Sequence, residues 1–397
     1  MSLINKVIWE EREAMYVSIV GIFLVKRVVI GGHRRYVELM HQLAEKGHKI
    51  DIISQFGFPA HRNIDNHTIG VKDKFFFLPF SIKLLLSMIR NSKRVRVACH
   101  KSDLILIFSI STLFAALYLK RRFGLPIVFG LRQDILRSRE ILIQSNGTRF
   151  GFITLRNKWM LKIYYWLFVK ILRPLLIRVD KIIVLNQADK EQIQQLVGPS
   201  KKIDVIPNNI NTSWIKREYE NRNRSTQLRN MVFIGSLIER KGVMYLLKAF
   251  EQLIKDGYNF SLSILGDGRQ RDEVERFIMK NNLRGSVQLY GYVENPLDFL
   301  YRSNLLVVPS LQDSFPNVII ESFYVGTPVI GSRISGIKSI LNDDRLLLDP
   351  GCERSLYKKL VELLDTNYYN SCRETCNSRK KDFYFDWAEE FLVCSLY

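Results

Sequence analysis

The stretch from Ser310 to Gly331, SLQDSFPNVIIESFYVGTPVIG, constrains the fold more than any other part of the chain. The apolar run just before it, Leu305–Val308, is typical of a buried strand. A polar loop follows, and residues 317–325 then carry apolar side chains at helical spacing, with Gly326 in the position of a C-terminal helix cap. The order strand, loop and helix forms the corner at which open α/β sheets bind their ligands. We therefore predict an α/β fold with a ligand site at this corner.

Two carboxylates flank the predicted corner. Asp313 lies in the loop, and Glu321 lies eight positions later, one turn inside the helix. A carboxylate can accept hydrogen bonds from neighbouring hydroxyls, and the free N–H groups of a helix start attract an anion. A sugar linked to phosphate offers both features. The alternative is that both acids are ordinary solvated residues, which is the usual state of Asp and Glu.

The length and charge of the chain set further limits. With 397 residues, of which 47% are apolar and 25% charged, the chain can form two globular domains. Its net charge of +20 lies almost entirely in residues 1–210, which contain 34 Lys and Arg against 15 Asp and Glu. Such a basic surface attracts nucleic acid, anionic lipid or a phosphorylated substrate. The five cysteines lack the paired spacing of a metal site, and without a signal peptide in view the cytoplasm is the expected location.

The corner also resembles a family motif. DSFPNVIIES followed by GTPVIGS is similar to the E-x7-E signature of family 4 glycosyltransferases, retaining enzymes of the GT-B type that use nucleotide-sugar donors. The resemblance implies two Rossmann-like domains whose parallel sheets face a central cleft. It also implies that Asp313 holds the donor hexose and that Glu321 holds the ribose. Because Asp stands where the family usually has Glu, the sugar preference stays open.

The first half has the opening pattern of a Rossmann-like domain. A strand-like apolar run is followed by Gly31 and Gly32, a helix-like segment and a second strand. In the family that the string GGHRRYVELMHQLAEKGHKIDII resembles, this glycine pair lets acceptor and donor phosphates approach the backbone. Family members often have histidine after later strands, where this chain has Arg132 and Asp134. These two residues are candidates for the acceptor side, or for a salt bridge within their loop.

The second half carries donor-site motifs in the order of the family, GSLIERKG, GDG, GYV and DSFPNVIIE. A glycine-rich turn exposes backbone N–H groups, and a lysine adds a mobile ammonium, so both suit a diphosphate. The family usually has Arg beside the first glycine, where this chain has Ser236. The predicted donor site comprises Gly235, Ser236, Arg240, Lys241, Gly266, Val293, Asp313, Ser314, Phe315, Pro316, Asn317 and Glu321, with Asp313, Lys241 and Glu321 as catalytic residues.

A polar stretch divides the chain. We predict an acceptor domain at 1–210, a linker at 211–229, and a nucleotide-sugar-binding domain at 230–380. The resemblance implies that the remaining segment, 381–397, crosses back to the first domain through a helix starting near Phe383. The sequence NNI stands just before the linker where the family commonly shows PNG, and we expect Asn209 to adopt the left-handed conformation that glycine otherwise supplies.

Two segments of the basic half combine aromatic and basic residues. They are residues 72–96 and residues 158–178, and Pro174 is expected to kink or end a helix in the second. Both patterns suit helices that lie in an anionic membrane interface. They suit equally well amphipathic helices that cover a sheet.

Together these observations predict a hexosyltransferase. The donor would be a nucleotide-diphospho-sugar, and the acceptor a saccharide or lipid-linked saccharide used in cell-surface polysaccharide or glycolipid synthesis at an anionic membrane surface, with retention at the anomeric carbon. No metal or other cofactor is expected, because cationic side chains and helix starts can stabilise a diphosphate. One alternative is an inactive homologue acting as a subunit, favoured by Ser236, Asp313 and Ser339. The other is a nucleic-acid-binding protein, favoured by the charge, although no nucleic-acid motif is present.

Overall fold

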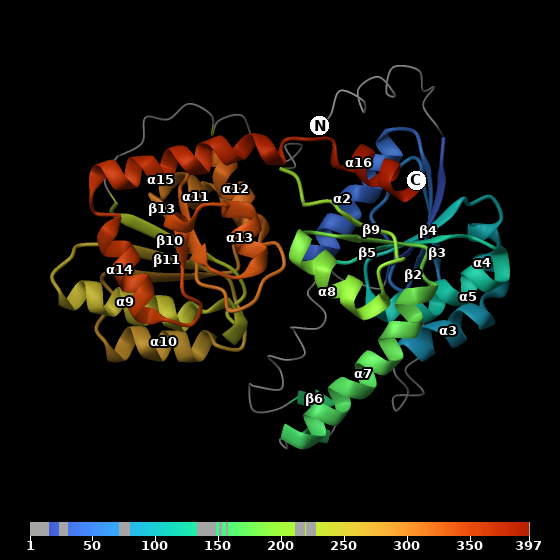
Figure 1. Cartoon of the computed structure of the whole chain (residues 1–397), viewed down its shortest axis with the longest axis horizontal. Coiled ribbons are helices and arrows are strands. Elements are labelled where there is room, and N and C mark those ends of the chain that lie inside the picture. Colours follow the sequence, from blue (N-terminus) through green and yellow to red (C-terminus); the bar gives the residue numbers. More distant parts are fainter. Residues whose placement is uncertain are drawn as a thin grey trace.

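The chain forms two α/β domains that lie side by side (Figure 1). This computed structural model describes residues 16–23, 31–70, 80–132, 148–150, 153–155, 158–210, 219 and 228–396. The first domain, here called the acceptor domain, is built on one parallel sheet, and the second, the donor domain, on another. The predicted fold class is confirmed. Most of the predicted linker, residues 211–229, lies outside the described residues.

The acceptor-domain sheet has seven parallel strands in the order β3-β2-β1-β4-β5-β8-β9. Strands β1, β4, β5 and β8 are buried along their whole length, which explains their continuous runs of Val, Ile and Leu. The strands are β1 (Ser18–Phe23), β2 (Lys49–Ser54), β3 (Ile64–Thr68), β4 (Leu104–Ile107), β5 (Ile127–Gly130), β8 (Lys181–Val184) and β9 (Ile203–Val205), and a separate antiparallel hairpin joins β6 (Thr148–Phe150) and β7 (Ile153–Leu155).

Helices cover both faces of this sheet. On one face α2 packs with the last helix of the chain, α16, around a core that includes Trp387 and Phe391. The opposite face is covered by α3, α4, α5, α7 and α8, which share a second core. The helices are α2 (Gly31–Glu45), α3 (Phe80–Arg90), α4 (Ser92–Cys99), α5 (Leu113–Phe123), α7 (Lys158–Arg178), α8 (Gln187–Val197) and α16 (Trp387–Leu396), with a 3-10 turn η2 (Ile110–Thr112) before α5.

Pro174 was expected either to kink or to end helix α7, and the helix does not end there but continues to Arg178. Its side chains Leu172 and Leu176 are buried in the core on either side of the proline. This packing holds the last turn in helical conformation although proline removes one backbone hydrogen bond.

The donor-domain sheet has six parallel strands in the order β12-β11-β10-β13-β14-β15. The strands are β10 (Asn230–Ile234), β11 (Ser261–Leu265), β12 (Val287–Gly291), β13 (Leu305–Val308), β14 (Val329–Ser332) and β15 (Leu347–Leu348). The helices are η4 (Glu239–Lys241), α9 (Val243–Lys255), α10 (Arg271–Lys280), α11 (Leu297–Arg302), α12 (Asn317–Val325), α13 (Ser335–Leu341), η5 (Asp344–Leu346), α14 (Glu353–Glu362), α15 (Thr366–Arg379) and η6 (Lys380–Phe383).

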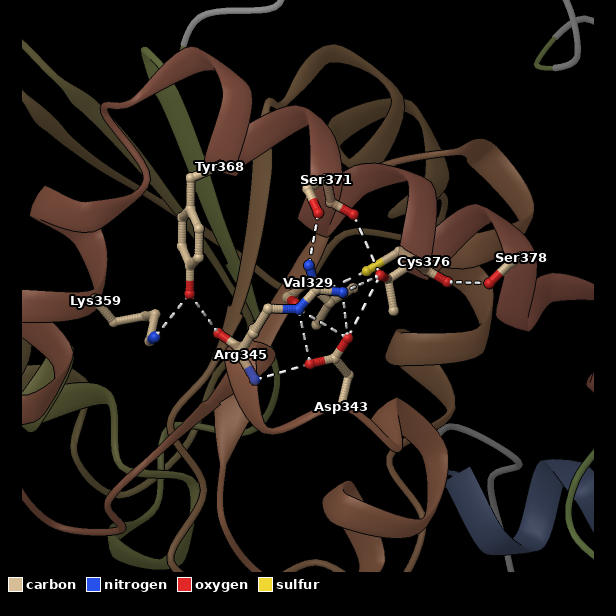
Figure 2. Close-up of polar contacts among 9 residues, drawn as sticks. Val329, Asp343, Arg345, Lys359, Tyr368, Ser371, Cys376 and Ser378 are labelled. Carbon is tan, nitrogen blue, oxygen red and sulfur yellow. Dashed lines mark hydrogen bonds and ion pairs between the residues drawn. The ribbon is translucent and has the colours of Figure 1, made fainter.

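A polar network fixes α15 to the donor domain (Figure 2). Arg345, in turn η5, donates to Ser371 Oγ at 2.6 Å and to Thr375 Oγ1 at 2.9 Å, both on α15. Asp343 accepts hydrogen bonds from Arg345, and this contact lowers the pKa of the Asp343 carboxyl. None of these side chains lines the interdomain cavity described below, so we assign the network a structural role, which is to hold α15 in place.

The chain passes between the domains at two adjacent segments. The backbone N–H of Ile210 donates to Phe383 O at 2.8 Å, so the outgoing and returning segments are joined. Phe383 ends η6 and packs against Phe315 in the donor-domain core, with ring centroids 6.0 Å apart. The last helix therefore begins at Trp387 and not near Phe383, where the sequence predicted it.

Candidate active site

A cavity of about 420 Å³ lies between the two domains, within the range usual for small-molecule sites. Its donor-domain wall consists of the carboxyl ends of β10 and β11, the loop after β12 and the first turn of α12. Its acceptor-domain wall is α2. The cavity lies at the carboxyl ends of the donor-domain strands, where the strand order of the sheet reverses between β10 and β13. The lining residues are Arg34, Arg35, Glu38, Asn209, Ile210, Ile234, Gly235, Ser236, Leu265, Gly266, Asp267, Tyr292, Val293, Glu294, Pro296, Asn317, Val318, Ile320 and Glu321.

The predicted corner has the expected geometry. After β13 the loop reaches Pro316, and α12 then runs from Asn317 to Val325. Gly326 ends the helix in the left-handed conformation, with φ of 73°. No side chain caps the start of α12. The N–H of Ile319 donates to Pro316 O, whereas Asn317 and Val318 line the cavity, where N–H groups of a helix start can meet an anion.

Glu321 is the acid of this corner that faces the cavity. Burial raises the pKa of its carboxyl to about 7. The charges of Arg34 and Arg35 across the cleft lower this pKa, and the charge of Glu38 raises it. The acid of the donor domain is thus in electrostatic contact with three charged residues of the acceptor domain.

The other acid, Asp313, is paired with Lys241. Lys241 Nζ donates to Asp313 Oδ2, although the two residues are 72 positions apart in the chain. Lys241 comes from the turn after β10 and Asp313 from the loop after β13, and these are neighbouring strands. Neither side chain is among the cavity-lining residues, so the pair stands beside the cavity.

Two glycines allow these loops to approach each other. Gly242, which follows Lys241, has φ of 71°, and a Cβ there would lie 2.0 Å from the carbonyl oxygen of Pro309. A Cβ on Gly336, in α13, would lie 2.1 Å from the carbonyl oxygen of Asp313. Any other residue at either position would push the loop of Asp313 away from its neighbours.

Six of the predicted donor-site residues line the cavity, and the others lie elsewhere. Gly235, Ser236, Gly266, Val293, Asn317 and Glu321 line it. The Arg240 guanidinium donates to the backbone carbonyl of Gln312 at 3.3 Å. Ser314 O accepts a hydrogen bond from the amide of Asn186 at 2.9 Å, and Phe315 is buried in the core. Pro316 is buried where it precedes α12.

Two adjacent asparagines hold the surroundings of the cavity together, Asn208 between the domains and Asn209 between α2 and the returning segment. Asn208 Oδ1 accepts from Arg132 at 3.0 Å, and Asn208 Nδ2 donates to Asn317 Oδ1 at 2.7 Å. Asn209 Oδ1 accepts from Arg35 at 2.6 Å, and its Nδ2 donates to Phe385 O at 2.9 Å. The prediction that Asn209 is left-handed is wrong, because its φ is not positive. The contribution of Asn209 comes from its side-chain hydrogen bonds and not from a special backbone conformation.

Arg132 lies behind the cavity and not in its wall. Its guanidinium carbon is 4.7 Å from the ring centroids of both Phe108 and Trp387, and the Arg35 guanidinium carbon is 4.2 Å from that of Trp387. Burial, with the nearby charge of Arg35, holds the pKa of Arg132 well below its usual value. Asp134, the other residue considered for the acceptor side, lies outside the described residues.

The sequence interpretation missed the contribution of α2. Gly31 and Gly32, which the sequence placed in a loop before the helix, form its first turn instead. However, Arg34, Arg35 and Glu38 are the residues of this helix that line the cavity. Glu38 accepts from Arg34 Nε and from Arg35 Nη1, each at 2.9 Å. The spacing of three and four positions between these charges was the available signal.

Among the residues that the structure describes, no group of three or more His, Cys, Asp or Glu is placed to hold a metal ion. In the same part of the chain, no helix is long and apolar enough to cross a membrane.

Two family models match the chain and together span both domains. Residues 30–214 match the model described as Glycosyltransferase Family 4, and residues 229–366 match the one described as Glycosyl transferases group 1. The chain belongs to the GT-B glycosyltransferases. Both matches include cavity residues, namely Arg34, Arg35 and Glu38 in the first and Glu321 in the second.

Curated relatives of this glycosyltransferase match it over part of their length. An uncharacterized glycosyltransferase of Methanocaldococcus jannaschii is 33% identical over 38% of this chain and 39% of its own. Capsular polysaccharide biosynthesis glycosyltransferase CapM of Staphylococcus aureus is 25% identical over 51% of this chain and 53% of its own. An Escherichia coli enzyme named UDP-Gal:alpha-D-GlcNAc-diphosphoundecaprenol alpha-1,3-galactosyltransferase is 25% identical over 58% of this chain and 62% of its own. The chain thus spans about half the length of these relatives.

Solved glycosyltransferase structures show the same fold over nearly the whole chain. Sucrose-phosphate synthase of Thermosynechococcus elongatus superposes with a TM-score of 0.74 at 17% identity, covering 96% of this chain and 99% of that one. Anabaena HepE in complex with UDP and glucose superposes with a TM-score of 0.72 at 15% identity, with the same coverage. At these identities the likeness establishes the fold.

Proposed function

We propose that this glycosyltransferase moves a hexose from a nucleotide-diphospho-sugar to a saccharide acceptor, with retention at the anomeric carbon. The observation that carries the proposal is the position of Glu321. It faces an interdomain cavity at the carboxyl ends of β10 and β11, next to the uncapped start of α12. Such a site offers a carboxylate for sugar hydroxyls and N–H groups for phosphate in one enclosed space.

Each part of the donor has a matching group in this cavity or beside it. The ionised Glu321 carboxylate accepts hydrogen bonds from the ribose hydroxyls. The diphosphate lies against the turn of Gly235 and Ser236, and the Lys241 ammonium, one loop away, stabilises the charge that develops on it. Asp313, held by Lys241 in the structure, accepts hydrogen bonds from the hexose.

The transfer step then needs no redox partner. The bond between the anomeric carbon and the diphosphate oxygen breaks, and its electron pair stays on the diphosphate. The acceptor hydroxyl oxygen forms the new bond on the same face of the sugar, and its proton passes to the departing diphosphate. Cationic groups and helix N–H groups carry the leaving-group charge, so we propose that catalysis requires no metal ion.

The relatives favour a particular donor and acceptor class. The Escherichia coli relative is named for UDP-galactose and a saccharide on diphosphoundecaprenol, and the CapM relative for capsular polysaccharide biosynthesis. We therefore propose a UDP-hexose as donor and a lipid-diphosphate-linked saccharide as acceptor, in the synthesis of a polysaccharide or glycolipid.

Nucleotide binding and donor hydrolysis test this proposal. UDP, GDP and ADP are added separately in a thermal unfolding assay, and release of sugar from UDP-hexoses is measured without acceptor. We expect UDP to stabilise the protein most, by about 2.7 kcal/mol at one hundred times its dissociation constant. Glu321→Ala should remove that stabilisation and the turnover while the protein stays folded. Stabilisation without hydrolysis of any nucleotide sugar would instead favour an inactive subunit, and stabilisation by none of the three would overturn the proposal.

A further inference from the structure

Four of the five helices on one side of the acceptor domain carry basic residues and no acids, whereas the fifth, α8, contains Asp189, Lys190 and Glu191. Helices α3, α4, α5 and α7, here called the basic face, contain thirteen Lys and Arg and no Asp or Glu. The helices on the other side of the same sheet, α2 and α16, each contain two glutamates. Within the basic face, Lys120 is paired with Asp180 from the adjoining loop. These four helices therefore supply thirteen of the 34 basic residues at positions 1–210, with no acid among them.

The same face exposes apolar side chains. Eighteen large hydrophobic residues are exposed in the described part of the chain, and eleven of them belong to these four helices. They are Ile82, Leu86, Ile89, Val97, Phe114, Trp159, Ile163, Trp166, Leu167, Ile171 and Ile177.

Helix α7 concentrates both features. It projects from the body of the acceptor domain (Figure 1). Its period places Trp159, Ile163, Trp166 and Ile177 on one face, which does not include the buried Leu172 and Leu176. Trp159 is 75% exposed and Trp166 is 55% exposed. Lys170 lies over the Trp166 ring at 4.6 Å, so a cation accompanies the exposed aromatic surface.

We propose that the basic face binds the surface of an anionic lipid bilayer, with α7 lying in the interface between headgroups and acyl chains. Tryptophan is favoured at that depth, and lysines on the same helix extend to the phosphates. The basic residues of α3, α4 and α5 add attraction to the negative surface. The attachment is peripheral, on the cytoplasmic leaflet, which is the leaflet rich in anionic lipid.

The charge pattern argues against other occupants of this face. A second copy docked through the same face would bring thirteen cations against thirteen, which repel each other. Nucleic acid would gain from the cations but would leave the exposed isoleucines and leucines in water. A bilayer with anionic headgroups accommodates both the cations and the apolar side chains. The inference does not depend on the proposed transfer reaction, because attachment is measured without substrates.

Vesicle binding by the full chain tests the inference. The protein is mixed with phosphatidylcholine vesicles that contain or lack phosphatidylglycerol, and the bound fraction is measured by flotation at low and high salt. We expect binding to the anionic vesicles that weakens as salt increases, with the tryptophan emission shifting to shorter wavelength. Binding to neither kind of vesicle at low salt would overturn the inference.

Two double variants separate the apolar and charged contributions. Trp159→Ala with Trp166→Ala, and Lys162→Glu with Lys170→Glu, should each weaken binding to the anionic vesicles about tenfold or more. The matched control is Lys280→Glu with Lys358→Glu on the exposed surface of the donor domain, which should bind as the wild type does. All variants should keep the wild-type unfolding temperature and nucleotide binding. Equal vesicle binding by all variants would overturn the assignment. So would a protein that does not bind vesicles but forms a dimer or an RNA complex that the α7 variants abolish.

Discussion

Asn208 Nδ2 donates a hydrogen bond to Asn317 Oδ1 across the domain boundary, at 2.7 Å. Asn317 is the first residue of α12, the helix that carries Glu321. On its other side, Asn208 accepts a hydrogen bond from Arg132 of the acceptor domain. One amide group therefore joins the acceptor domain to the helix that faces the donor, and it sets the position of that helix relative to the opposite wall of the cavity.

Replacing Asn208 with alanine should impair turnover more than nucleotide binding. Asn208→Ala leaves Arg132 and Asn317 without this partner, which should lower the free energy of unfolding by about 1–3 kcal/mol. We expect kcat to fall about tenfold because the two walls are no longer held in register, while UDP affinity stays within about twofold. Steady-state kinetics and UDP titration measure this difference. Asn281→Ala is the control, since that amide binds only within its own helix end, at Phe277 O. Unchanged kcat in a less stable protein would show that Asn208 serves the fold alone.

Local sequence was enough to predict the corner at Asp313 and Glu321. Strand β13 and helix α12 follow from the spacing of apolar residues, and the end of the helix follows from the left-handed conformation of Gly326. All of these signals lie within 22 consecutive residues. The pairing of Lys241 with Asp313 was not visible locally, but the family order of motifs and the rule that strand ends meet at one edge made their proximity an expectation.

The rest of the site depends on contacts between distant parts of the chain. Arg35 and Asn209 are 174 positions apart, and Asn209 and Phe385 are 176 apart. No periodicity relates such positions. Asn209 was therefore interpreted through its backbone, whereas its amide bridges α2 and the returning segment. Phe383 was likewise assigned to the last helix, although it packs in the donor-domain core.

Lys241 should matter far more than the neighbouring arginine. Lys241→Ala removes the ammonium that we place near the leaving diphosphate, so kcat should fall by about 10²–10³-fold. Arg240→Ala is the matched control, because that guanidinium is directed to the Gln312 carbonyl, and it should cost less than about tenfold. Initial rates with saturating donor measure both. An equal loss of rate in Arg240→Ala and Lys241→Ala would contradict the assignment of the diphosphate to Lys241 alone.

Chelation should not affect the enzyme. If the leaving-group charge is carried by Lys241 and by backbone N–H groups, EDTA should change the rate by less than about twofold. The assay compares chelated protein with the same protein after addition of Mg²⁺ or Mn²⁺. Loss of activity that either ion restores would contradict the proposed metal-independent reaction.

Trp387 should be necessary for the docking of α16. Its side chain is fully buried, and the Arg35 and Arg132 guanidinium groups lie over its ring. Trp387→Ala should lower the free energy of unfolding by about 3–5 kcal/mol, measured by urea denaturation. Tyr384→Ala, an exposed aromatic three residues earlier, is the control and should cost much less. A small effect of Trp387→Ala would mean that α16 contributes little to the acceptor-domain core.

The raised pKa of Glu321 should make both stability and nucleotide binding depend on pH near neutrality. Burial holds this carboxyl at a pKa of about 7, compared with 4.5 for the unperturbed group. Between those two values the folded protein binds more protons than the unfolded chain, so this residue's contribution to stability is complete below about pH 4.5 and is lost as pH rises through about 7. Relative to Glu321→Gln, the wild type should therefore lose up to about 3 kcal/mol over that interval, measured by urea denaturation.

UDP binding should show the opposite trend, because the ionised carboxylate is the form that accepts hydrogen bonds from the ribose. The ratio of wild-type to Glu321→Gln affinity should rise by up to about tenfold between about pH 6 and about pH 8, and taking the ratio cancels the titration of UDP itself. Glu374→Gln, an exposed acid on α15, is the control and should follow the wild type at every pH. A constant ratio would show that Glu321 does not bind the nucleotide through its carboxylate, even if the stability profile changes as expected.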